Sequence, residues 1–555
     1  MKFTRIFDLV VNGAKSFGQK TAFSNQERGK WIDYSFVEYL NNANHVSAQL
    51  LDLGIEKNDV VVTISPNRAE WNFIDMGVLQ IGCVHAPLFP TFSKDDFRFV
   101  IENCNAKVVI VSGDVLLKLI LEIQPDLPNL EYVMTIDEND AEAMSLWDGI
   151  SLSSKHANEI DVRRDAVLPE DVASISYSSG TYWKPMGAEV QHKPIVAMTK
   201  SFSQDYTLNE NDRALSFLPL CHAYERAHTY AYQYCGVSAY YTEIGANLLS
   251  IIQEVQPTIF TSVPALLENL FSGLTRPKEG ATKKELIVRN EALEFAFCFE
   301  PKNNTPIPNE YEVLFSSWKQ VLGENIRIIS CAGAPLAERL SRAFWAMGIN
   351  LLEAYGITEA QLVSINSLKT GYQCGTVGPP QENVQVKIAP DGEILCKSDY
   401  IMLRYHNNPE STRTAFTKDG WYKTGDIGEF VDSKFLKIVG RKKVLFKAAN
   451  GRYVSPARIE TVLIKSDIIS QALVFEMKGV IYVAIVPSTS LRGEIKTDIR
   501  KRMELEIDKL YNETVPLEER IAEIVLIDRP WTVESGDLTP NMKPRRKVIM
   551  SKMKF

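Results

Sequence analysis

The chain has 555 residues, and its shares of hydrophobic (45%) and charged (23%) residues exclude a disordered or fibrous protein and indicate a globular one. The net charge of −8 lacks the basic surplus that a nucleic-acid-binding surface needs. None of the eight cysteines forms a Cys-x-x-Cys pair, so the sequence favours free thiols over a zinc site or a redox motif.

The amino-terminal part of the chain alternates short β-like runs with helical stretches. We expect buried strands at 59–64 and 106–112, helices at 69–82 and 116–123, and a loop at 86–91, which contains two prolines. Strands that alternate with helices predict an α/β fold whose parallel sheets are covered on both faces.

The carboxy-terminal part predicts two smaller units. The β-rich run at 385–396 contains Asp391-Gly392, a hairpin signal, and predicts a β subdomain. From residue 459 the pattern predicts a helix, strands at 471–475 and 480–486, and an amphipathic helix at 501–511. That order is typical of a small α+β domain.

The predicted fold is therefore α/β with two domains. A large N-terminal domain at 1–438 would hold two α/β sheet subdomains and the β subdomain, and a small α+β domain at 439–555 would follow. No run of about 18 apolar residues predicts a transmembrane helix. The first 15 residues lack the apolar core of a signal peptide, so we expect a cytoplasmic protein.

The segment 176–188, SYSSGTYWKPMGA, carries the first chemical signal. It follows a predicted strand at 172–175, offers the hydroxyls of Ser178, Ser179 and Thr181, and contains Gly180. Successive backbone N–H groups in such a turn form an anion nest that suits a triphosphate. Taken alone, a Ser/Gly-rich loop is more often a surface turn.

Two later segments add groups suited to a nucleotide. ISCAGAPL at 329–336 would expose backbone groups around Gly333 to a base, and EAYGITEA at 353–360 offers the ring of Tyr355 as a stacking face. Thr358 and Glu359 supply a hydroxyl and a carboxylate for phosphate and Mg²⁺, although a Thr-Glu pair alone usually caps a helix.

The last two segments supply a carboxylate and cations. DGWYKTGDIG at 419–428 places Asp426 in a Gly-flanked turn, where a carboxylate can accept two ribose hydroxyls. LKIVGRKK at 436–443 places Arg441 beyond a strand. Lys543, near the end of a small domain, could stabilise negative charge on a reacting carboxylate, or could be a plain tail residue.

The order and spacing of these motifs resemble the adenylate-forming (ANL) superfamily, and within it the long-chain fatty-acyl-CoA synthetases. The likeness extends from about residue 172 to 549 and rests on SYSSGT, FLPLCHAYER, FTSVP, CAGAPL, YGITE, GTVG, DGWYKTGDIG, LKIVGRKK, GRYVSP and LTP-x-x-K. It implies an ATP-dependent fatty acid:CoA ligase. The acid would be activated as acyl-AMP and then transferred to the thiol of CoA, with ATP, Mg²⁺ and coenzyme A as cofactors.

The resemblance also implies roles for individual residues. The phosphates would lie against Ser178, Ser179, Gly180, Thr181 and Lys184, the adenine against Gly333, Ala334, Pro335, Tyr355 and Gly356, and the ribose against Asp426 and Arg441. Catalytic roles fall to Lys543, Thr358, Glu359 and His222, with Glu359 as the Mg²⁺ ligand. Lys443 matches the hinge of a mobile small domain, and Gly451 the loop used with CoA.

Several positions depart from the family pattern. Tyr182, Trp183 and Met186 replace the usual Thr, Gly and Lys of the phosphate loop. Ala332 and Ala354 each add a methyl group where the family often has Gly, which predicts a narrower pocket for shorter or slimmer acids.

These departures leave two alternatives to the active ligase open. One is a catalytically impaired homologue that still binds an acyl group or a nucleotide, and the other is an acyl-AMP ligase with a carrier-protein acceptor. The basic stretch at 543–555 is either solvated or in contact with an anionic substrate or a membrane surface. Partners are therefore expected to be fatty acid, ATP and CoA, without nucleic acid; the oligomeric state is not predicted.

Overall fold

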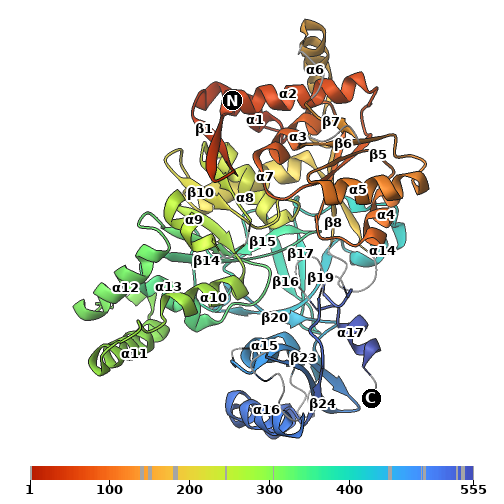
Figure 1. Cartoon of the computed structure of the whole chain (residues 1–555). Helices are drawn as coiled ribbons and strands as arrows, with labels where there is room; N and C mark the ends of the chain where they lie inside the picture. The colour runs from red at the N-terminus through yellow and green to blue at the C-terminus, as the bar shows by residue number, and fades with distance from the viewer. Residues whose placement is uncertain are drawn as a thin grey trace.

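The computed structural model in Figure 1 describes most of the chain. The described residues are 3–137, 143–147, 153–178, 185–243, 245, 247–303, 305–447, 453–464, 466–488, 491, 496–532, 535–538 and 544–553.

Two eight-stranded, largely parallel sheets form the body of the molecule. The first has the order β18 (Arg404–Tyr405), β9 (Gly187–Gln191), β8 (Val172–Tyr177), β4 (Val84–Leu88), β3 (Val60–Ile64), β5 (Ala106–Val111), β6 (Tyr132–Thr135) and β7 (Met144–Ser145). The second has the order β15 (Gln361–Ile365), β14 (Asn350–Ile357), β13 (Ile328–Cys331), β12 (Ile259–Ser262), β10 (Arg213–Ser216), β11 (Ser238–Tyr241), β1 (Thr21–Glu27) and β2 (Lys30–Ser35).

Helices cover both faces of these sheets, as the parallel strands require. The helices of this part are α1 (Asp8–Phe17), α2 (Phe36–Asp52), α3 (Ala69–Gln80), α4 (Lys94–Asn103), α5 (Asp114–Ile123), α6 (Ser154–Ala166), α7 (His192–Asp205), α8 (Ala223–Cys235), α9 (Leu248–Val255), α10 (Pro264–Leu274), α11 (Lys283–Cys298), α12 (Asn309–Val321), α13 (Glu338–Ala346) and α14 (Pro409–Ala415). A central core joins one face of each sheet to α2, α3, α7 and α8. Separate cores lie on the outer faces, with α9–α13 on the second sheet and α4 and α5 on the first.

Three smaller sheets complete the described part of the fold. An antiparallel sheet has the order β16 (Gln385–Ile388), β17 (Glu393–Lys397), β19 (Tyr422–Val431) and β20 (Phe435–Arg441). Beyond it lie β21 (Phe446–Lys447), β22 (Tyr453–Val454), α15 (Pro456–Leu463), β23 (Ile469–Met477), β24 (Val480–Pro487), α16 (Lys496–Leu510), β25 (Glu523–Leu526) and α17 (Arg546–Lys552). This last unit has its own apolar cores and lies at the bottom of Figure 1.

The predicted fold class is confirmed: the fold contains two α/β sheet subdomains, a β subdomain and a small α+β unit, and the strands of the two large sheets interleave along the chain. The domain boundary at 438/439 stays a prediction. Among the described parts of the chain, no helix combines the length and apolar character needed to cross a membrane.

The expected loop at 86–91 is wrong in its first half, because β4 (Val84–Leu88) is a fully buried strand. Pro87 lacks the N–H of a ladder donor. The proline is tolerated because β4 and β8 pair only briefly, at His85 and Ser174, so no hydrogen bond from position 87 is needed there. The proline near the end of this central strand therefore led to the prediction of a loop where an apolar run forms a strand.

The buried helix α3 carries the charge on which the central core depends. Every residue of α3 is buried, including Asp75, whose carboxylate pairs with Arg226 of α8 at 2.6 Å. Asp75 is also in contact with the His85 ring at 2.6 Å and accepts a hydrogen bond from the Tyr230 hydroxyl at 2.7 Å. Burial alone would raise the pKa of Asp75, but the Arg226 charge and these hydrogen bonds outweigh it and bring the pKa to about 2.

Each of the three guanidinium nitrogens of Arg226 donates a hydrogen bond within the core. It donates to Asp75, to the Ser174 hydroxyl of β8 at 2.6 Å and to the Tyr230 hydroxyl at 2.6 Å. The network thus joins α8 to α3 and to the first sheet. Because α8 packs on the second sheet through its other side chains, the pair fixes one sheet against the other.

We predict that Arg226→Met lowers the free energy of unfolding by about 3–5 kcal/mol, because the substitution leaves the Asp75 carboxylate buried without its counter-charge. The matched control is Arg500→Met on α16, whose exposed pair with Glu504 spans 3.1 Å and should contribute less than about 0.5 kcal/mol. Urea unfolding followed by intrinsic fluorescence compares the two. Equal shifts of the two midpoints would show that the buried pair carries no special weight.

Candidate functional site

Tyr355, Asp426 and Arg441 meet where the second sheet contacts the antiparallel sheet. The Tyr355 hydroxyl donates to Asp426 Oδ2 at 2.5 Å, and Arg441 Nε lies 3.0 Å from Asp426 Oδ1. Asp426 and Arg441 are register partners on β19 and β20, so the hairpin itself sets their distance. The carboxylate is buried, whereas the Arg441 side chain is 57% exposed. The three predicted nucleotide residues therefore form one connected group that faces solvent through Arg441.

Backbone rather than side chains is exposed beside this group. Gly333, Ala334 and Pro335 follow β13 and are exposed, and Gly333 has a φ of 90°, a conformation that favours glycine. A Cβ on Gly356 would lie 2.2 Å from the carbonyl oxygen of Gln361, so no other residue fits there without moving that backbone. Gly333 thus allows the turn that follows β13, and Gly356 allows β14 to lie close to the backbone of Gln361.

Glu359 lies in the turn between β14 and β15, and its carboxylate is held by a tyrosine. Tyr405 of β18 donates from its hydroxyl to Glu359 Oε1 at 2.8 Å. Burial raises the pKa of Tyr405, so this hydroxyl keeps its proton and remains a donor. Thr358 precedes Glu359, and its carbonyl accepts from the Gln361 side-chain amide at 2.6 Å. The Thr-Glu pair therefore follows a strand and does not cap a helix.

The start and end of the predicted phosphate loop lie next to the same tyrosine. Ser178 N–H donates to the Met186 carbonyl at 3.0 Å, and the Met186 N–H donates to Ser178 Oγ at 3.3 Å. These contacts close the β8–β9 hairpin, and β9 pairs with β18 through Ala188 and Tyr405. The loop thus begins after β8 and ends before β9, and β9 pairs with the strand that carries the Glu359 partner. Six predicted site residues lie outside the described part of the chain: Ser179, Gly180, Thr181, Lys184, Gly451 and Lys543.

His222 occupies the N-cap of α8. Its Nδ1 accepts from the N–H of Tyr224 at 3.2 Å, and its ring packs edge-on against Phe89 with centroids 6.2 Å apart. Two residues further on, the Tyr224 hydroxyl is 2.7 Å from the Ser330 hydroxyl of β13. This contact joins the start of α8 to β13, the strand that precedes Gly333. Lys443 is exposed in the turn after β20.

Sequence reasoning did not single out three residues that hold the site together: Tyr405, Thr424 and Glu225. The Thr424 hydroxyl accepts from the Asp426 N–H at 3.1 Å, and its carbonyl accepts from Arg441 at 3.2 Å. Glu225 is fully buried and accepts from the hydroxyls of Ser216, at 2.5 Å, and Thr261. Thr424 and Glu225 lie within recognised motifs, but Tyr405 is far from any of them and no signal pointed to it.

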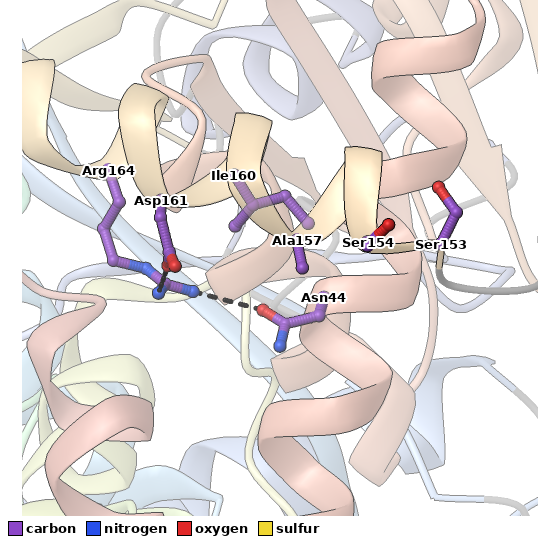
Figure 2. A pocket seen from close by; sticks show the side chains of 7 residues that line it. All are labelled: Asn44, Ser153, Ser154, Ala157, Ile160, Asp161 and Arg164. Carbon is purple, nitrogen blue, oxygen red and sulfur yellow. Dashed lines mark hydrogen bonds and ion pairs between the residues drawn. The ribbon is translucent and has the colours of Figure 1, made fainter.

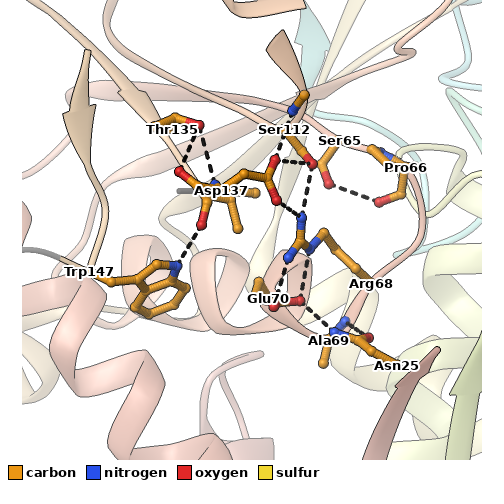
Figure 3. A network of polar contacts seen from close by, with 12 residues as sticks. Asn25, Ser65, Pro66, Arg68, Ala69, Glu70, Ser112, Thr135, Asp137 and Trp147 are labelled. Atoms are coloured by element: carbon orange, nitrogen blue, oxygen red, sulfur yellow. Dashed lines mark hydrogen bonds and ion pairs between the residues drawn. The ribbon is translucent and has the colours of Figure 1, made fainter. Parts of the chain in front are cut away.

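The ends of the first sheet hold a different kind of network, which Figure 3 shows. Arg68, after β3, donates to Glu70, to Ser112 and to Asp137, the last at 2.6 Å. Asp137 also accepts from the N–H of Gly113 at 2.8 Å. In a parallel α/β sheet these strand ends are the usual place for a ligand. Here the protein's own charges occupy the ends of β3, β5 and β6, which leaves the end of β8 and the ends of the second sheet as candidates.

A shallow pocket between α2 and α6 is remote from the predicted site residues. Figure 2 shows its lining: Asn44, Ser153, Ser154, Ala157, Ile160, Asp161 and Arg164. Arg164 donates within it to Asn44 at 3.1 Å and to Asp161 at 2.8 Å. The polar groups of this pocket are therefore largely engaged with one another. The described residues also contain no cluster of three or more His, Cys, Asp or Glu side chains that could hold a metal ion.

Comparisons with known proteins identify the family of this chain. The family model described as AMP-binding enzyme matches residues 11–406, and the chain belongs to that family. It is 29% identical over 554 residues to a long-chain-fatty-acid–CoA ligase of Mycobacterium bovis, covering 94% of this chain and 91% of that protein. It is 27% identical to the peroxisomal long chain acyl-CoA synthetase 7 of Arabidopsis thaliana, covering 98% and 84% of the two chains.

Solved structures share the fold. The A domain of a carboxylic acid reductase from Segniliparus rugosus, in complex with AMP and a co-purified carboxylic acid, matches with a TM-score of 0.76 and 17% identity over 99% of this chain and 92% of that chain. An O-succinylbenzoate CoA synthetase from Bacillus subtilis, in complex with AMP, matches with a TM-score of 0.71 and 18% identity over 97% of both chains. The predicted family and fold are thus confirmed.

We predict that Asp426→Asn weakens AMP binding about 10- to 100-fold, because charge-assisted hydrogen bonds to a carboxylate contribute roughly 1.5–3 kcal/mol. The change also removes the charge that holds Arg441. Asp432→Asn, at the exposed far end of the same β19–β20 hairpin, is the matched control and should bind AMP as the wild type does. Calorimetric titration with AMP measures both. Unchanged affinity in Asp426→Asn would remove this carboxylate from the nucleotide site.

A second prediction concerns pH and Glu225, whose pKa burial raises from 4.5 to about 7. In the folded protein this carboxyl keeps its proton up to about pH 7, while in the unfolded chain it loses the proton near its ordinary pKa. Its contribution to stability therefore falls as the pH rises from about 4.5 to 7 and is constant above. Glu225→Gln, which cannot ionise, should gain about 3 kcal/mol over the wild type at pH 8 and little at pH 5.

Unfolding midpoints of Glu225→Gln and wild type, measured across this pH range, test the prediction. Both proteins share every other titrating group, so their difference isolates position 225. Parallel pH profiles would contradict the raised pKa.

Proposed function

We propose that the protein is an ATP-dependent fatty acid:CoA ligase that forms an acyl-AMP intermediate. Its membership of the AMP-binding enzyme family supports the adenylating step. Its similarity to ligases of bacteria, plants and mammals named for long-chain fatty acids and CoA, over at least 93% of this chain, supports the acid and the acceptor. The observation that carries the proposal is the connected group of Tyr355, Asp426 and Arg441 beside the exposed Gly333 loop.

The first half-reaction follows from this arrangement. A carboxylate oxygen of the acid attacks the α-phosphorus of ATP, the bond to the β-phosphate oxygen breaks, and pyrophosphate leaves. Asp426 would accept the ribose hydroxyls, and the backbone at Gly333–Pro335 and Gly356 would border the adenine. Catalysis of this kind depends on positioning and on neutralising charge. Thr358, Ser178 and His222 are proposed to contact the phosphates and the carboxylate.

The second half-reaction transfers the acyl group. The CoA thiol attacks the acyl carbon as a thiolate, a thioester bond forms, and AMP leaves with the former carboxylate oxygen. We propose that the small domain, which would begin near 438/439, contributes residues to both half-reactions. Lys543 would act in adenylation, Lys443 at the hinge and Gly451 in the approach of CoA, while Ser179, Gly180, Thr181 and Lys184 would hold the phosphates.

Glu359 fits the expected Mg²⁺ ion, since Mg²⁺ needs only one or two protein carboxylates when substrate phosphates and waters fill its remaining positions. When bound, the ion would neutralise phosphate charge during the attack. The Tyr405 hydroxyl would orient the carboxylate that holds it.

We predict that the purified protein releases pyrophosphate from ATP with a fatty acid alone and forms the CoA ester when CoA is added. Glu359→Gln should lower the rate of pyrophosphate release at least about tenfold. The substitution would weaken metal binding and the hydrogen bond by which Tyr405 orients the side chain at position 359. Glu429→Gln on β19, an exposed carboxylate 3.6 Å from Lys437, is the matched control and should retain the wild-type rate.

Each failure identifies a different alternative. Pyrophosphate release with a carrier protein but no ester with CoA would indicate an acyl-AMP ligase. Nucleotide binding without pyrophosphate release would indicate an impaired homologue, and Tyr182→Thr, Trp183→Gly and Met186→Lys together should then restore activity.

A further inference from the structure

Asn67, which follows β3, contacts the segment of chain that leads into His222. Its side-chain amide donates to the Leu218 carbonyl at 2.7 Å, and its Oδ1 accepts from the Leu220 N–H at 3.0 Å. Both partners belong to the stretch 217–222 between β10 and α8, where the chain forms neither a helix nor a strand. The peptide groups of such a stretch lie in no ladder and need other partners. Asn67 supplies two of them.

The contacts of Asn67 act close to the backbone of His222. The His222 N–H donates to the Pro219 carbonyl at 2.9 Å, and Pro219 lies between the two residues that Asn67 holds. The ring of His222 caps α8 through its Nδ1 and packs edge-on against Phe89. A shift of the backbone at 218–220 would therefore pass directly to His222.

Arg68, the next residue along the chain, anchors the loop that carries Asn67. Its backbone is extended, with φ −162° and ψ 160°, and neighbouring side chains of an extended chain point to opposite sides. The guanidinium donates to Glu70 at 2.9 Å, to Ser112 at 2.9 Å and to Asp137 at 2.6 Å, in the network that Figure 3 shows. The loop after β3 is thereby tied to the ends of β5 and β6.

We infer that Asn67 is a positioning residue for His222, and that the Arg68 network supports this role by holding the loop of Asn67 on the first sheet. The inference rests on the proposed ligase function, in which His222 contacts the reacting groups. An amide suits the task because one side chain can donate to a carbonyl and accept from an N–H, which fixes a segment in direction and in register. A displacement of about 1 Å can lower a rate about 100-fold.

The test measures pyrophosphate release from ATP with palmitate by the wild type, Asn67→Ala, His222→Ala and the double variant. Each single substitution should lower kcat at least about tenfold. The double variant should have a kcat within about twofold of that of His222→Ala, because the effects of residues that act through one another do not multiply. The KM for ATP should change less than about threefold in Asn67→Ala, since Tyr355, Asp426 and Arg441 lie on other elements.

Asn512, which follows α16, provides the matched control. Its side chain also holds a backbone segment, donating to the Ile521 carbonyl at 3.1 Å and accepting from the Ile521 N–H at 2.9 Å. Asn512→Ala removes the same kinds of hydrogen bond, so it should lower the free energy of unfolding while kcat stays within about twofold of the wild type. This control separates a loss of stability from a loss of positioning.

A binding measurement separates this inference from the proposed function. The same variants are titrated by calorimetry with a non-hydrolysable palmitoyl-adenylate analogue, which requires no turnover. Asn67→Ala should weaken binding about tenfold and should not weaken it further once position 222 is alanine. Coupled binding without pyrophosphate release would contradict the ligase function and leave the role of Asn67 standing. Independent effects of the two substitutions in both assays would overturn the inference.

Asn67→Asp covers the case in which Asn67→Ala does not fold. It keeps the size of the side chain and the acceptor for the Leu220 N–H, but it places an oxygen against the Leu218 carbonyl. It should therefore lower kcat in the same coupled way, and a folded Asn67→Asp with the wild-type kcat would contradict the inference. If neither variant folds, Asn67 belongs to the fold itself and the inference is overturned.

Discussion

The buried pair of Asp75 and Arg226 is the interaction on which the other features of the site depend. It joins α3 and the first sheet to α8, and α8 is the element that carries His222 at its start and Tyr224 and His228 along its inner face. A charge pair this deep is stable only when its geometry is complete, and here His85, Ser174 and Tyr230 supply the remaining hydrogen bonds. The position of α8 between two sheets is thereby fixed in rotation as well as in depth. A purely apolar helix surface would fix depth alone.

The same helix shows why this core is polar. Arg226 faces the first sheet, while Tyr224, Glu225 and His228 reach Ser330, Ser216 and Thr261 on the second. Small hydroxyl residues on neighbouring parallel strands are what these larger polar side chains need, because each buried polar group requires a partner. The two sheets are therefore held at α8 by specific hydrogen bonds, whereas their outer faces are covered by the apolar clusters around α9–α13 and around α4 and α5. Specific contacts fall where the substrate is proposed to bind.

Local patterns predicted much of this fold but not its long-range contacts. The strands at 60–64 and 106–111, the helix at 69–80, the hairpin at Asp391-Gly392 and the order of the small α+β unit follow from periodicity and turn residues. β4 was missed because Pro87 outweighed an apolar run. Asp426 and Arg441 could be chosen from their motifs, but their pairing across β19 and β20 needed the register. Tyr405 could not be found from sequence, since its role comes from the pairing of β18 with β9, more than 200 residues earlier in the chain.

The candidate site combines features set by the backbone with features set by side chains. The proposed nucleotide contacts would be made by backbone at strand ends and by one hairpin register, so they would be insensitive to side chains elsewhere. The inner face of the second sheet is instead bordered by side chains at α7 and α8, where the hydroxyls of Tyr206 and Tyr224 meet Ser330 of β13. Ser330 is a small residue on which three large side chains converge, and a different residue there would release all three contacts at once. The packing of α8 on the second sheet therefore depends in part on one strand position, which the two residues between Ser330 and Gly333 separate from the proposed nucleotide site.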